Sequence, residues 1–436
     1  MAVACEVMRV GFYLENHSIR GIDLTRPELG NPGCGGTEYL FVALPYYLQK
    51  MRSESVEPVI LANSTAKLPS AIESIEAESL SDAAQKAFDA GCLYFVYRPR
   101  READYEFLHL IEHLGLASIA WAHITPTEEH LRRIRDCVAV KAVVCVEHEQ
   151  HDQAYDSSAW RKLTYIVNGF DVDSFRDFEP PPKKPNSVVY IGALVPQKGF
   201  HELADAWLQV VEKHPEAHLT VAGSGGLYGE GGELGPLGIA DRKYEERFTP
   251  SLLTNHGEIH DSVTFMGRVG LEKKQILSEA LIGVPNPTGQ TENCPGSALE
   301  FQAAGTAVVS GGYYGMLDTI EHKVTGLLGR GVDELVTHIS YFLSNPEEAK
   351  VYGERGIEFV SRRYNFDCVT AEWCELFQRL ESGARPAPKK MKRNYGTHYK
   401  YAIAANRVIQ KMLSGCIKWP SIAEAKLRLV NRLRSN

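Results

Sequence analysis

The chain has 436 residues, of which 44% are hydrophobic and 23% are charged, and its net charge is −8. This length exceeds what one hydrophobic core usually supports, so we expect two domains, and the ordinary composition excludes a wholly disordered chain. No apolar run approaches the roughly 18 residues that span a bilayer, and residues 1–10 lack the pattern of a signal peptide. A cytoplasmic location is therefore expected.

The charge is distributed unevenly along the chain. Residues 384–436, here called the extension, contain thirteen Lys or Arg residues and one acidic residue, Glu424, so the extension carries +12 and the rest −20. One helical face near the end is apolar and consists of Ile422, Ala425, Leu429 and Leu433. A basic amphipathic helix suits the inner face of an anionic membrane, and it equally suits packing on the acidic body of the protein. Nucleic-acid binding is not indicated, because the extension has no platform of aromatic and basic residues.

In the first half, short β-branched or aliphatic runs alternate with stretches of helical period, such as residues 37–50. This alternation is typical of a parallel sheet with helices on both faces. The predicted strands are 9–14, 58–62, 92–97, 117–121, 141–146 and 164–167.

A proline-rich stretch, residues 179–185, separates the two halves, because four prolines cannot continue a helix or a central strand. We expect a first domain over residues 1–180 and a second over residues 188–363. A helix at 364–383 is expected to cross back to the first domain, ahead of the extension.

The alternation resumes in the second half, where a helix is expected over Phe200–Lys213. Leu203, Trp207 and Val210 recur there at helical spacing and should form one buried stripe. The predicted strands are 188–191, 218–222, 263–266, 281–284 and 307–309. Two α/β units leave a cleft between the carboxyl ends of their strands, where open sheets of this kind bind ligands.

Two loops of the second half carry candidate binding groups. Lys198 follows a predicted strand and precedes a helix, where a cation and the helix dipole suit a phosphate. From this loop alone, an exposed surface lysine is the favoured interpretation. Glu292 lies in a loop before a helix in which Pro295 takes the first position, and Glu300 lies in the second turn. These carboxylates suit sugar and ribose hydroxyls. Alternatively, Ser297 and Glu300 form a capping box.

These segments resemble a known family. Residues 188–226, the two glutamates separated by seven residues, and Ala304-Gly305-Thr306-Ala307 are together similar to the C-terminal domain of family 4 retaining glycosyltransferases, the glycosyl transferases group 1 of GT-B fold. The similarity covers roughly residues 188–380 and is weaker in the first half, where Gly35-Gly36-Thr37-Glu38, His123 and Asn168-Gly169 fall at the expected positions. It implies two facing Rossmann-like domains.

The resemblance also implies roles for individual residues. Lys198 would contact the diphosphate of a nucleotide-sugar donor, Glu292 would position the sugar, and Glu300 would hold the ribose. His123 would line the acceptor side near the anomeric carbon, so His123, Glu292 and Lys198 are the catalytic candidates. The donor site would be completed by Gly35, Gly36, Asn293, Cys294, Pro295, Gly296 and Ser297. The donor is expected to carry UDP rather than GDP, with no metal and no other cofactor.

Three departures from the family pattern stand out. Ala193 occupies the place of an arginine that usually accompanies Lys198 on the diphosphate, so one cation is missing. Cys294-Pro295 replaces the common Phe-Gly. The connection between residues 225 and 260 is longer and richer in glycine than usual, and it is either a loop over a substrate or a surface insertion.

Other polar residues have weaker claims to function. Arg98 follows a predicted strand, where it would bind an anionic acceptor, supply the missing cation, or lie in an exposed basic turn. His123 would otherwise be a satisfied core imidazole. Asp171 and Asp173 resemble a metal-binding pair of a different fold, but their position on a turn favours a structural role.

The expected activity is retaining transfer of a sugar to a hydroxyl of a glycan, a lipid-linked molecule or a small-molecule acceptor, which is hexosyltransferase chemistry. One alternative is an inactive nucleotide-sugar-binding subunit, which the replacement at Ala193 would explain. A second is a nucleotide-sugar epimerase, which would interconvert donors without an acceptor.

Overall fold

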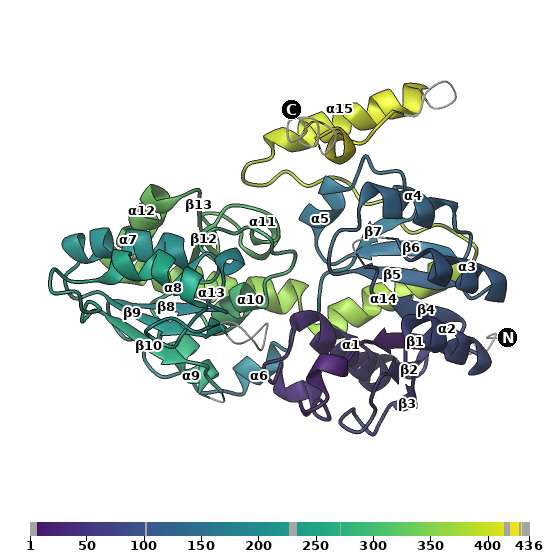
Figure 1. Cartoon of the computed structure of the whole chain (residues 1–436), viewed down its shortest axis with the longest axis horizontal. Helices are drawn as coiled ribbons and strands as arrows, with labels where there is room; N and C mark the ends of the chain where they lie inside the picture. The colour runs from purple at the N-terminus through teal and green to yellow at the C-terminus, as the bar shows by residue number, and fades with distance from the viewer. Residues whose placement is uncertain are drawn as a thin grey trace. The chain divides into compact units, whose positions relative to one another are not determined.

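A computed structural model of the chain describes residues 7–100, 103–225, 233–270, 272–413, 419–426 and 429 (Figure 1). The chain forms two compact units. The first comprises Met1–Gly169 together with Phe366–Asn436, and the second comprises Phe170–Asn365. Each unit is an α/β sandwich around one parallel sheet, which confirms the predicted pair of Rossmann-like domains.

The first unit contains a seven-stranded sheet in the order β3-β2-β1-β4-β5-β6-β7, and every pairing is parallel. Its strands are β1 (Met8–Leu14), β2 (Val56–Ala62), β3 (Glu73–Glu76), β4 (Tyr94–Tyr97), β5 (Ser118–Ala122), β6 (Val140–Cys145) and β7 (Leu163–Tyr165). Six of the seven strands were predicted. β3 was missed because it is a short edge strand with a polar sequence and no buried residue.

The helices of the first unit are α1 (Gly36–Arg52), α2 (Leu80–Asp89), α3 (Tyr105–Leu114), α4 (Glu128–Asp136), α5 (His148–Gln153), α14 (Phe366–Glu381) and α15 (His398–Leu413). They flank this sheet, except for α15, which packs on α5. α14 packs along α1, where the rings of Tyr47 and Phe366 stack with their centroids 3.9 Å apart. The chain therefore returns to the first unit after it has completed the second.

The second unit contains a six-stranded parallel sheet in the order β10-β9-β8-β11-β12-β13. Its strands are β8 (Ser187–Ile191), β9 (His218–Ala222), β10 (Val263–Gly267), β11 (Ile282–Val284), β12 (Ala307–Gly311) and β13 (Gly326–Gly329). The sequence did not predict β13, because Gly-Leu-Leu-Gly is too short to show a period. Both sheets have the doubly wound order in which the first strand lies beside the second and the fourth.

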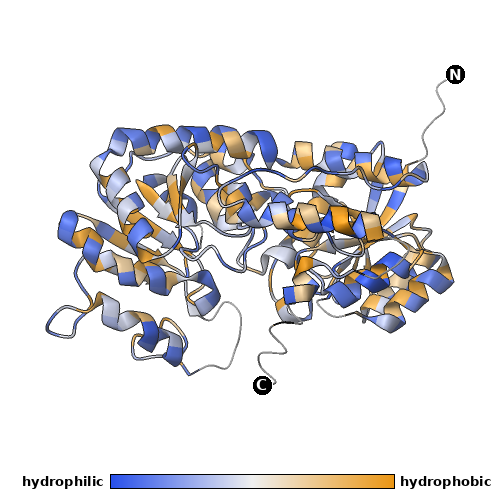
Figure 2. Cartoon of the chain, turned by 90° about the horizontal axis from the view of Figure 1, so that it is seen from above, coloured by the Kyte–Doolittle hydropathy of each residue, from blue (hydrophilic) through white to orange (hydrophobic). Residues whose placement is uncertain are grey.

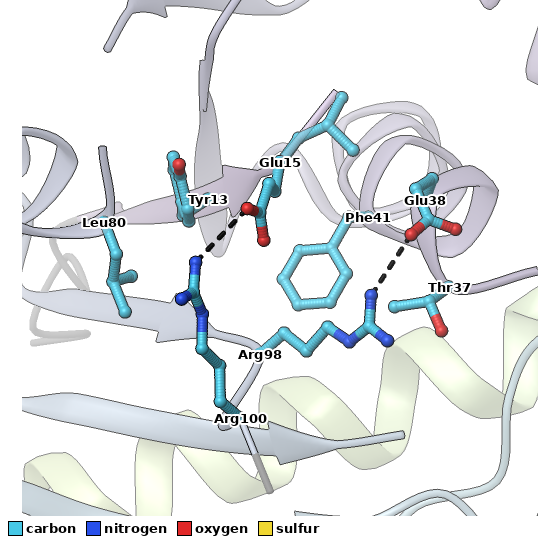
Figure 3. Close-up of a pocket in the computed structure, with 9 residues that line it drawn as sticks. Tyr13, Glu15, Thr37, Glu38, Phe41, Leu80, Arg98 and Arg100 are labelled. Atoms are coloured by element: carbon cyan, nitrogen blue, oxygen red, sulfur yellow. Dashed lines mark hydrogen bonds and ion pairs between the residues drawn. The ribbon is translucent and has the colours of Figure 1, made fainter. Parts of the chain in front are cut away.

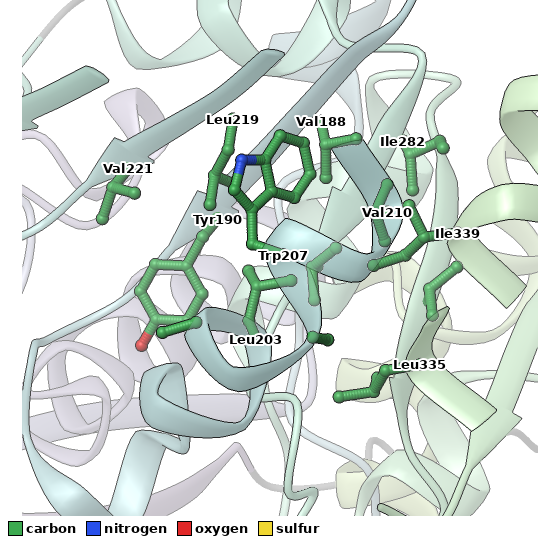
Figure 4. Close-up of a cluster of buried hydrophobic side chains, with 14 of the residues drawn as sticks. Val188, Tyr190, Leu203, Trp207, Val210, Leu219, Val221, Ile282, Leu335 and Ile339 are labelled. Carbon is green, nitrogen blue, oxygen red and sulfur yellow. The ribbon is translucent and has the colours of Figure 1, made fainter. Parts of the chain in front are cut away.

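The helices of the second unit are α6 (Asp173–Arg176), α7 (Phe200–Lys213), α8 (Arg242–Phe248), α9 (Lys273–Glu279), α10 (Gly296–Ala303), α11 (Met316–Thr319), α12 (Val332–Ser344) and α13 (Pro346–Arg363). α7 has the predicted bounds, and its stripe of Leu203, Trp207 and Val210 is fully buried against the sheet (Figure 4). The indole of Trp207 donates a hydrogen bond to Ser262 Oγ at 2.9 Å, so its one polar atom is satisfied within the core.

The change from the first unit to the second occurs at Gly169, earlier than the prolines of residues 179–185. Residues 170–180, assigned to the first domain from the sequence, cluster with the second unit. The N–H of Phe170 donates to the carbonyl of Tyr364 at 2.7 Å, so the two passages between the units run side by side at this point. Backbone pairing of distant segments, which composition does not reveal, sets this boundary.

The long connection between β9 and β10 packs against α7. It forms α8 and the short helix η5 (Thr249–Leu252), whose Tyr244, Phe248 and Leu252 are buried in the core. The buried carboxylate of Glu245 accepts hydrogen bonds from the N–H groups of residues 237, 239 and 240 and so shapes the preceding turn. The described part of this connection is therefore packed into the core, so it is not a surface insertion without a role.

The extension packs on the first unit through charged residues. Nζ of Lys400 in α15 lies 2.6 Å from Glu149 and 2.8 Å from Asp152, both buried on α5. The guanidinium of Arg407 lies 3.5 Å from the ring centre of Trp160, and Asn406 donates to Asp156 at 2.7 Å. The extension therefore binds the acidic body of the protein, as one sequence interpretation proposed. Arg428, Arg432, Leu433 and Arg434 lie outside the described residues.

In Figure 2, hydrophobic residues (orange) are frequent in the strands, whereas the helices around them alternate between hydrophobic and hydrophilic (blue) residues. Among the described residues, no helix combines the length and the apolar character needed to cross a membrane.

We expect Lys400→Met to loosen the extension. The change leaves the Glu149 and Asp152 carboxylates buried without their cation, which costs about 3–5 kcal/mol for a broken buried ion pair. Hydrogen exchange should become faster in α15, and chemical denaturation should show a lower free energy of unfolding. Met412→Leu, an exposed change on the same helix, is the control and should alter the free energy of unfolding by no more than about 0.5 kcal/mol and leave exchange in α15 unchanged. Equal exchange in both variants would contradict the assignment.

Candidate functional site

In each unit, the sheet reverses its strand order at one point. This point lies between β1 and β4 in the first unit and between β8 and β11 in the second. Loops that leave the carboxyl ends of two such strands diverge to opposite faces and form a crevice for ligands. Lys198 follows β8 and Glu292 follows β11, whereas Gly36 follows β1 and Arg98 follows β4. The candidate residues thus lie at the reversal points, and each unit is described by itself.

The Lys198 loop is a tight turn that requires glycine. A short helix, η3 (Pro196–Lys198), ends at Gly199, which has a φ of +67° and begins α7. A Cβ at Gly199 would lie 2.8 Å from the backbone nitrogen of Thr288. The missing side chain at Gly199 therefore lets the Lys198 loop approach the loop that carries Glu292.

Lys198 and Glu292 form an ion pair between Nζ and Oε1. Their side chains are 25% and 13% exposed, so the pair is mostly removed from solvent but one side remains accessible. The resemblance assigned these two residues to the same donor, and the fold brings them into direct contact from positions 94 residues apart.

Asn286, which the sequence analysis did not single out, connects the same two loops. Its Nδ2 lies 3.2 Å from each of three acceptors, the carbonyls of Gln197 and Gln290 and Oε1 of Glu292. Its Oδ1 accepts from Thr288 Oγ1 at 2.8 Å and from the N–H of Gly289 at 3.1 Å. The amide is buried, and both its nitrogen and its oxygen have hydrogen-bond partners. It therefore holds the carboxylate of Glu292 in place. The only sequence signal was Asn-Pro directly after a strand.

Gly315 is a second positioning residue that the sequence did not reveal. Its N–H donates to the carbonyl of Glu292 at 2.8 Å, and a Cβ at this position would overlap the carbonyl oxygen of Asn293. The turn after β12 thereby supports the Glu292 loop from the other side. The sequence shows a glycine after a predicted strand, but it does not show that this glycine packs against the backbone of Asn293.

The helix after Glu292 begins one residue later than predicted. Pro295 is the N-cap of α10 and Gly296 is the first helical residue, so Ser297 stands too far into the helix to cap it, and no side chain does so. Oε1 of Glu300 instead accepts from Nζ of Lys273 in α9 at 2.7 Å. The capping-box interpretation is therefore wrong. The first amides of α10 have no partner within the helix and suit an anion.

The side chain of Ala193 supplies no positive charge at the position where the family usually has an arginine. The residue is buried, and its carbonyl accepts a hydrogen bond from the hydroxyl of Tyr190 at 3.1 Å. In the described part of this loop, Lys198 is the residue that supplies positive charge beside Glu292.

In the first unit, a pocket surrounds the start of α1 (Figure 3). Gly35 is the N-cap of α1, and the carboxylate of Glu38 folds back over it, where a Cβ would overlap. Oε1 of Glu38 accepts from Arg98 at 3.1 Å, and Glu15 accepts from Arg100 at 3.3 Å. Each arginine of the pocket therefore has an acidic partner. The pocket is also lined by Tyr13, Leu14, Thr37, Phe41 and Leu80.

His123 lies just after β5 and is only 9% exposed. Its ring centre is 4.5 Å from that of Trp121 and 5.7 Å from that of Phe41. Burial, with a smaller effect from the positive charge of Arg98, lowers the pKa of His123 to about 3. The imidazole is therefore neutral near pH 7.

The remaining acidic candidates have local partners. Asp171 accepts from the N–H of Ser174 at 3.3 Å, and Asp173 pairs with Arg176 at 3.2 Å, which agrees with the structural role expected for this turn. Among the described residues, one group has potential metal ligands within 4.8 Å of one another, and it consists of His148, His151 and Asp152. One member of this group, Asp152, also forms an ion pair at 2.8 Å with Lys400 of the extension.

The second unit matches a known family. Residues 171–359 match the model of the family described as glycosyl transferases group 1. A curated relative is the GDP-mannose-dependent alpha-(1-6)-phosphatidylinositol monomannoside mannosyltransferase of Mycobacterium tuberculosis. It is 26% identical over 289 residues, which cover 61% of this chain and 68% of the relative.

Solved glycosyltransferase structures share the fold over both units. Anabaena HepE in complex with UDP-glucose has a TM-score of 0.59 at 15% identity, and the match covers 86% of this chain and 100% of that one. A glycosyltransferase from Rickettsia africae has a TM-score of 0.65 at 13% identity, with 87% and 100% covered. At these identities, the likeness shows the GT-B fold.

We expect Asn286→Asp to destabilise the second unit. The new carboxylate would face Glu292 at about the 3.2 Å of the present hydrogen bond and would leave the carbonyls of Gln197 and Gln290 without a donor. Chemical denaturation should show a loss of about 2 kcal/mol or more. Asn345→Asp, which changes an exposed amide at the end of α12, should leave stability unchanged within about 0.5 kcal/mol. Similar values for the two variants would show that Asn286 does not hold the loops.

Proposed function

We propose that this chain, a group 1 glycosyltransferase of GT-B fold, moves a sugar from a nucleoside-diphosphate sugar to an acceptor hydroxyl with retention at the anomeric carbon. The observation that supports this reaction is the Lys198–Glu292 ion pair at the reversal point of the second sheet. The pair combines a cation for phosphate and a carboxylate for hydroxyl groups beside the start of α10.

The ion pair suggests how the donor binds. The diphosphate would take over Lys198, and its oxygens would also accept from the first amides of α10. Glu292, released from the lysine but still held by Asn286, would accept hydrogen bonds from sugar hydroxyls. The negative charge that develops on the departing diphosphate is then stabilised by groups already in place.

The ribose would bind at Glu300. Its carboxylate is anchored by Lys273 and is 17% exposed, so it keeps one lone-pair direction for a hydroxyl while its charge remains balanced. This pairing accounts for the position of the carboxylate in the second turn of α10 better than helix capping does. We propose that the reaction needs no metal, since the cations Lys198 and Lys273 lie beside the two carboxylates.

The acceptor would bind at the pocket of the first unit. Arg98 and Arg100 are paired with Glu38 and Glu15 in exposed or half-buried ion pairs, which exchange partners readily. We propose that an anionic group of the acceptor, such as a phosphate, replaces one of these carboxylates. The mycobacterial relative acts on a phosphatidylinositol monomannoside according to its name. A lipid-linked acceptor with a phosphate is therefore our leading proposal.

His123 would orient the acceptor or the sugar rather than transfer a proton. A neutral imidazole with a pKa of about 3 is a poor base at pH 7, but it can donate or accept a hydrogen bond. Gly35 and Gly36 at the start of α1 would let the donor diphosphate approach the backbone.

Replacement of either member of the ion pair tests the reaction. Purified Lys198→Met and Glu292→Gln should each lower kcat/KM for sugar transfer by about a hundredfold or more, because each removes a group that stabilises the transition state. The matched control is Lys350→Met, an exposed lysine of α13 that pairs with Glu347. Near-normal transfer by Lys198→Met or Glu292→Gln, with circular dichroism unchanged, would refute the assignment. Turnover in the presence of a chelator should equal that in its absence.

Donor binding can be measured without an acceptor. The mycobacterial relative is GDP-mannose-dependent by name, whereas HepE was solved with UDP-glucose, so UDP, GDP and ADP should be compared by thermal shift. The expected result is a higher Tm with UDP, because ligands that bind only the folded state stabilise it. The shift should disappear in Lys198→Met, shrink in Glu300→Ala and persist in Lys350→Met. A larger shift with GDP would identify guanine rather than uracil as the base of the donor. No shift with any of the three nucleotides would contradict the proposed donor site.

A further inference from the structure

Helix α15 turns its polar residues toward the protein. The buried residues of this helix are Lys400, Ile403 and Arg407, which recur at helical spacing. Lys400 is held by two carboxylates of α5, and Arg407 stacks on Trp160. Gln410 continues this side by donating to the carbonyl of Asp156 at 2.8 Å. The attachment of α15 to the first unit is thus mainly ionic and hydrogen-bonded.

The opposite side of α15 is apolar and exposed. It consists of Tyr401, Ala402, Ala405, Val408, Ile409 and Met412, all of which are exposed. At 100° per residue these six positions fall within an arc of about 120°, which also contains the exposed His398 at the start of the helix. None of the six carries a charge. Met412 is 79% exposed and Tyr401 58%, so large apolar side chains project into the solvent. We call this set the outer face of α15.

This polarity is the reverse of the usual one. A surface helix normally buries its apolar stripe against the core and shows its charges to water. Here the charges provide the attachment, and the apolar stripe is exposed on the side of the helix opposite Lys400 and Arg407. The helix itself lies beyond α5 (Figure 1). A contiguous exposed apolar stripe indicates a binding surface rather than a packing surface.

The charge around the outer face favours a membrane. The extension carries +12, and Lys390, Arg393, Lys411 and Lys426 are exposed near α15 in the sequence. An apolar stripe within a basic segment inserts among lipid chains while its cations bind anionic headgroups. A second copy of the chain fits less well, because two such extensions would repel each other. In addition, one face of a helix about 24 Å long offers less than the roughly 800 Å² per partner of a stable complex.

We propose that the outer face of α15 docks the protein on an anionic lipid surface, with Tyr401, Val408, Ile409 and Met412 inserted at the interface. Lys400 and Arg407 hold the helix to the first unit in the orientation that presents this face. The site differs from the helix expected over residues 422–433, because the lipid-binding residues belong to an earlier helix of the extension. Docking in this way does not depend on which sugar or base the enzyme uses.

Vesicle flotation of the full-length chain tests the proposal. The wild type should float with vesicles of phosphatidylcholine containing about one-third phosphatidylglycerol and should remain below vesicles of phosphatidylcholine alone. Val408→Glu and Met412→Glu should each lower the partition coefficient about tenfold, because a carboxylate must then enter the interface. High salt should weaken flotation of the wild type.

Val138→Glu is the matched control, since Val138 is an exposed apolar residue of the same unit, 71% exposed, and lies far from α15 in the sequence. It should float like the wild type. Wild type that does not float, or Val408→Glu and Met412→Glu that float equally well, would overturn the proposal. Light scattering that shows a dimer dispersed by Met412→Glu would assign the face to a second copy instead. Sugar transfer to a water-soluble acceptor should be the same in all these variants, so a failed flotation is distinguishable from a failed activity.

Discussion

The ion pair between Lys198 and Glu292 joins the two loops on which the second unit's candidate site depends. These loops leave adjacent strands, β8 and β11, in opposite directions, and the pair closes the space between them. Desolvation makes such a pair expensive unless other hydrogen bonds support it. Asn286 provides that support by donating to both loops and to the carboxylate itself. The carboxylate is thereby held in position before any ligand arrives, which reduces the reorganisation that binding requires.

The same principle operates at the reversal point of the first sheet. Arg98 and Arg100 are neutralised by Glu38 and Glu15, and the backbone of Gly35 lies beneath the Glu38 carboxylate. An anion that enters such a pocket exchanges one partner for another instead of meeting a bare charge. The two charge arrangements differ in burial, because the Lys198 pair is more enclosed than the Arg100 pair. Under the proposed function, the donor would therefore meet a more enclosed site than the acceptor.

Periodicity predicted most of the fold. Eleven of the thirteen strands among the described residues, and the bounds of α7, followed from apolar runs and helical spacing, because burial on both faces of a sheet leaves a clear pattern. β3 was missed because it is a polar edge strand without a buried residue. β13 is buried, but its four residues are too few to show a period. The candidate loops were also visible, since Lys198 and Glu292 follow predicted strands. Asn286 and Gly315 were not, because their roles depend on the backbone that each approaches.

The sequence by itself determined two α/β units, the loops that carry the charged candidates, and a strongly basic extension. These features depend on local composition and period, which the chain shows directly. Only the tertiary structure decided that Glu300 pairs with Lys273 rather than capping its helix, and that the extension attaches by Lys400 and Arg407 while its apolar face points outward. A side chain's partner depends on which distant segment folds against it. Helix α15 has both a basic and an apolar face, and the buried carboxylates of Glu149 and Asp152 on α5 bind the basic face through Lys400.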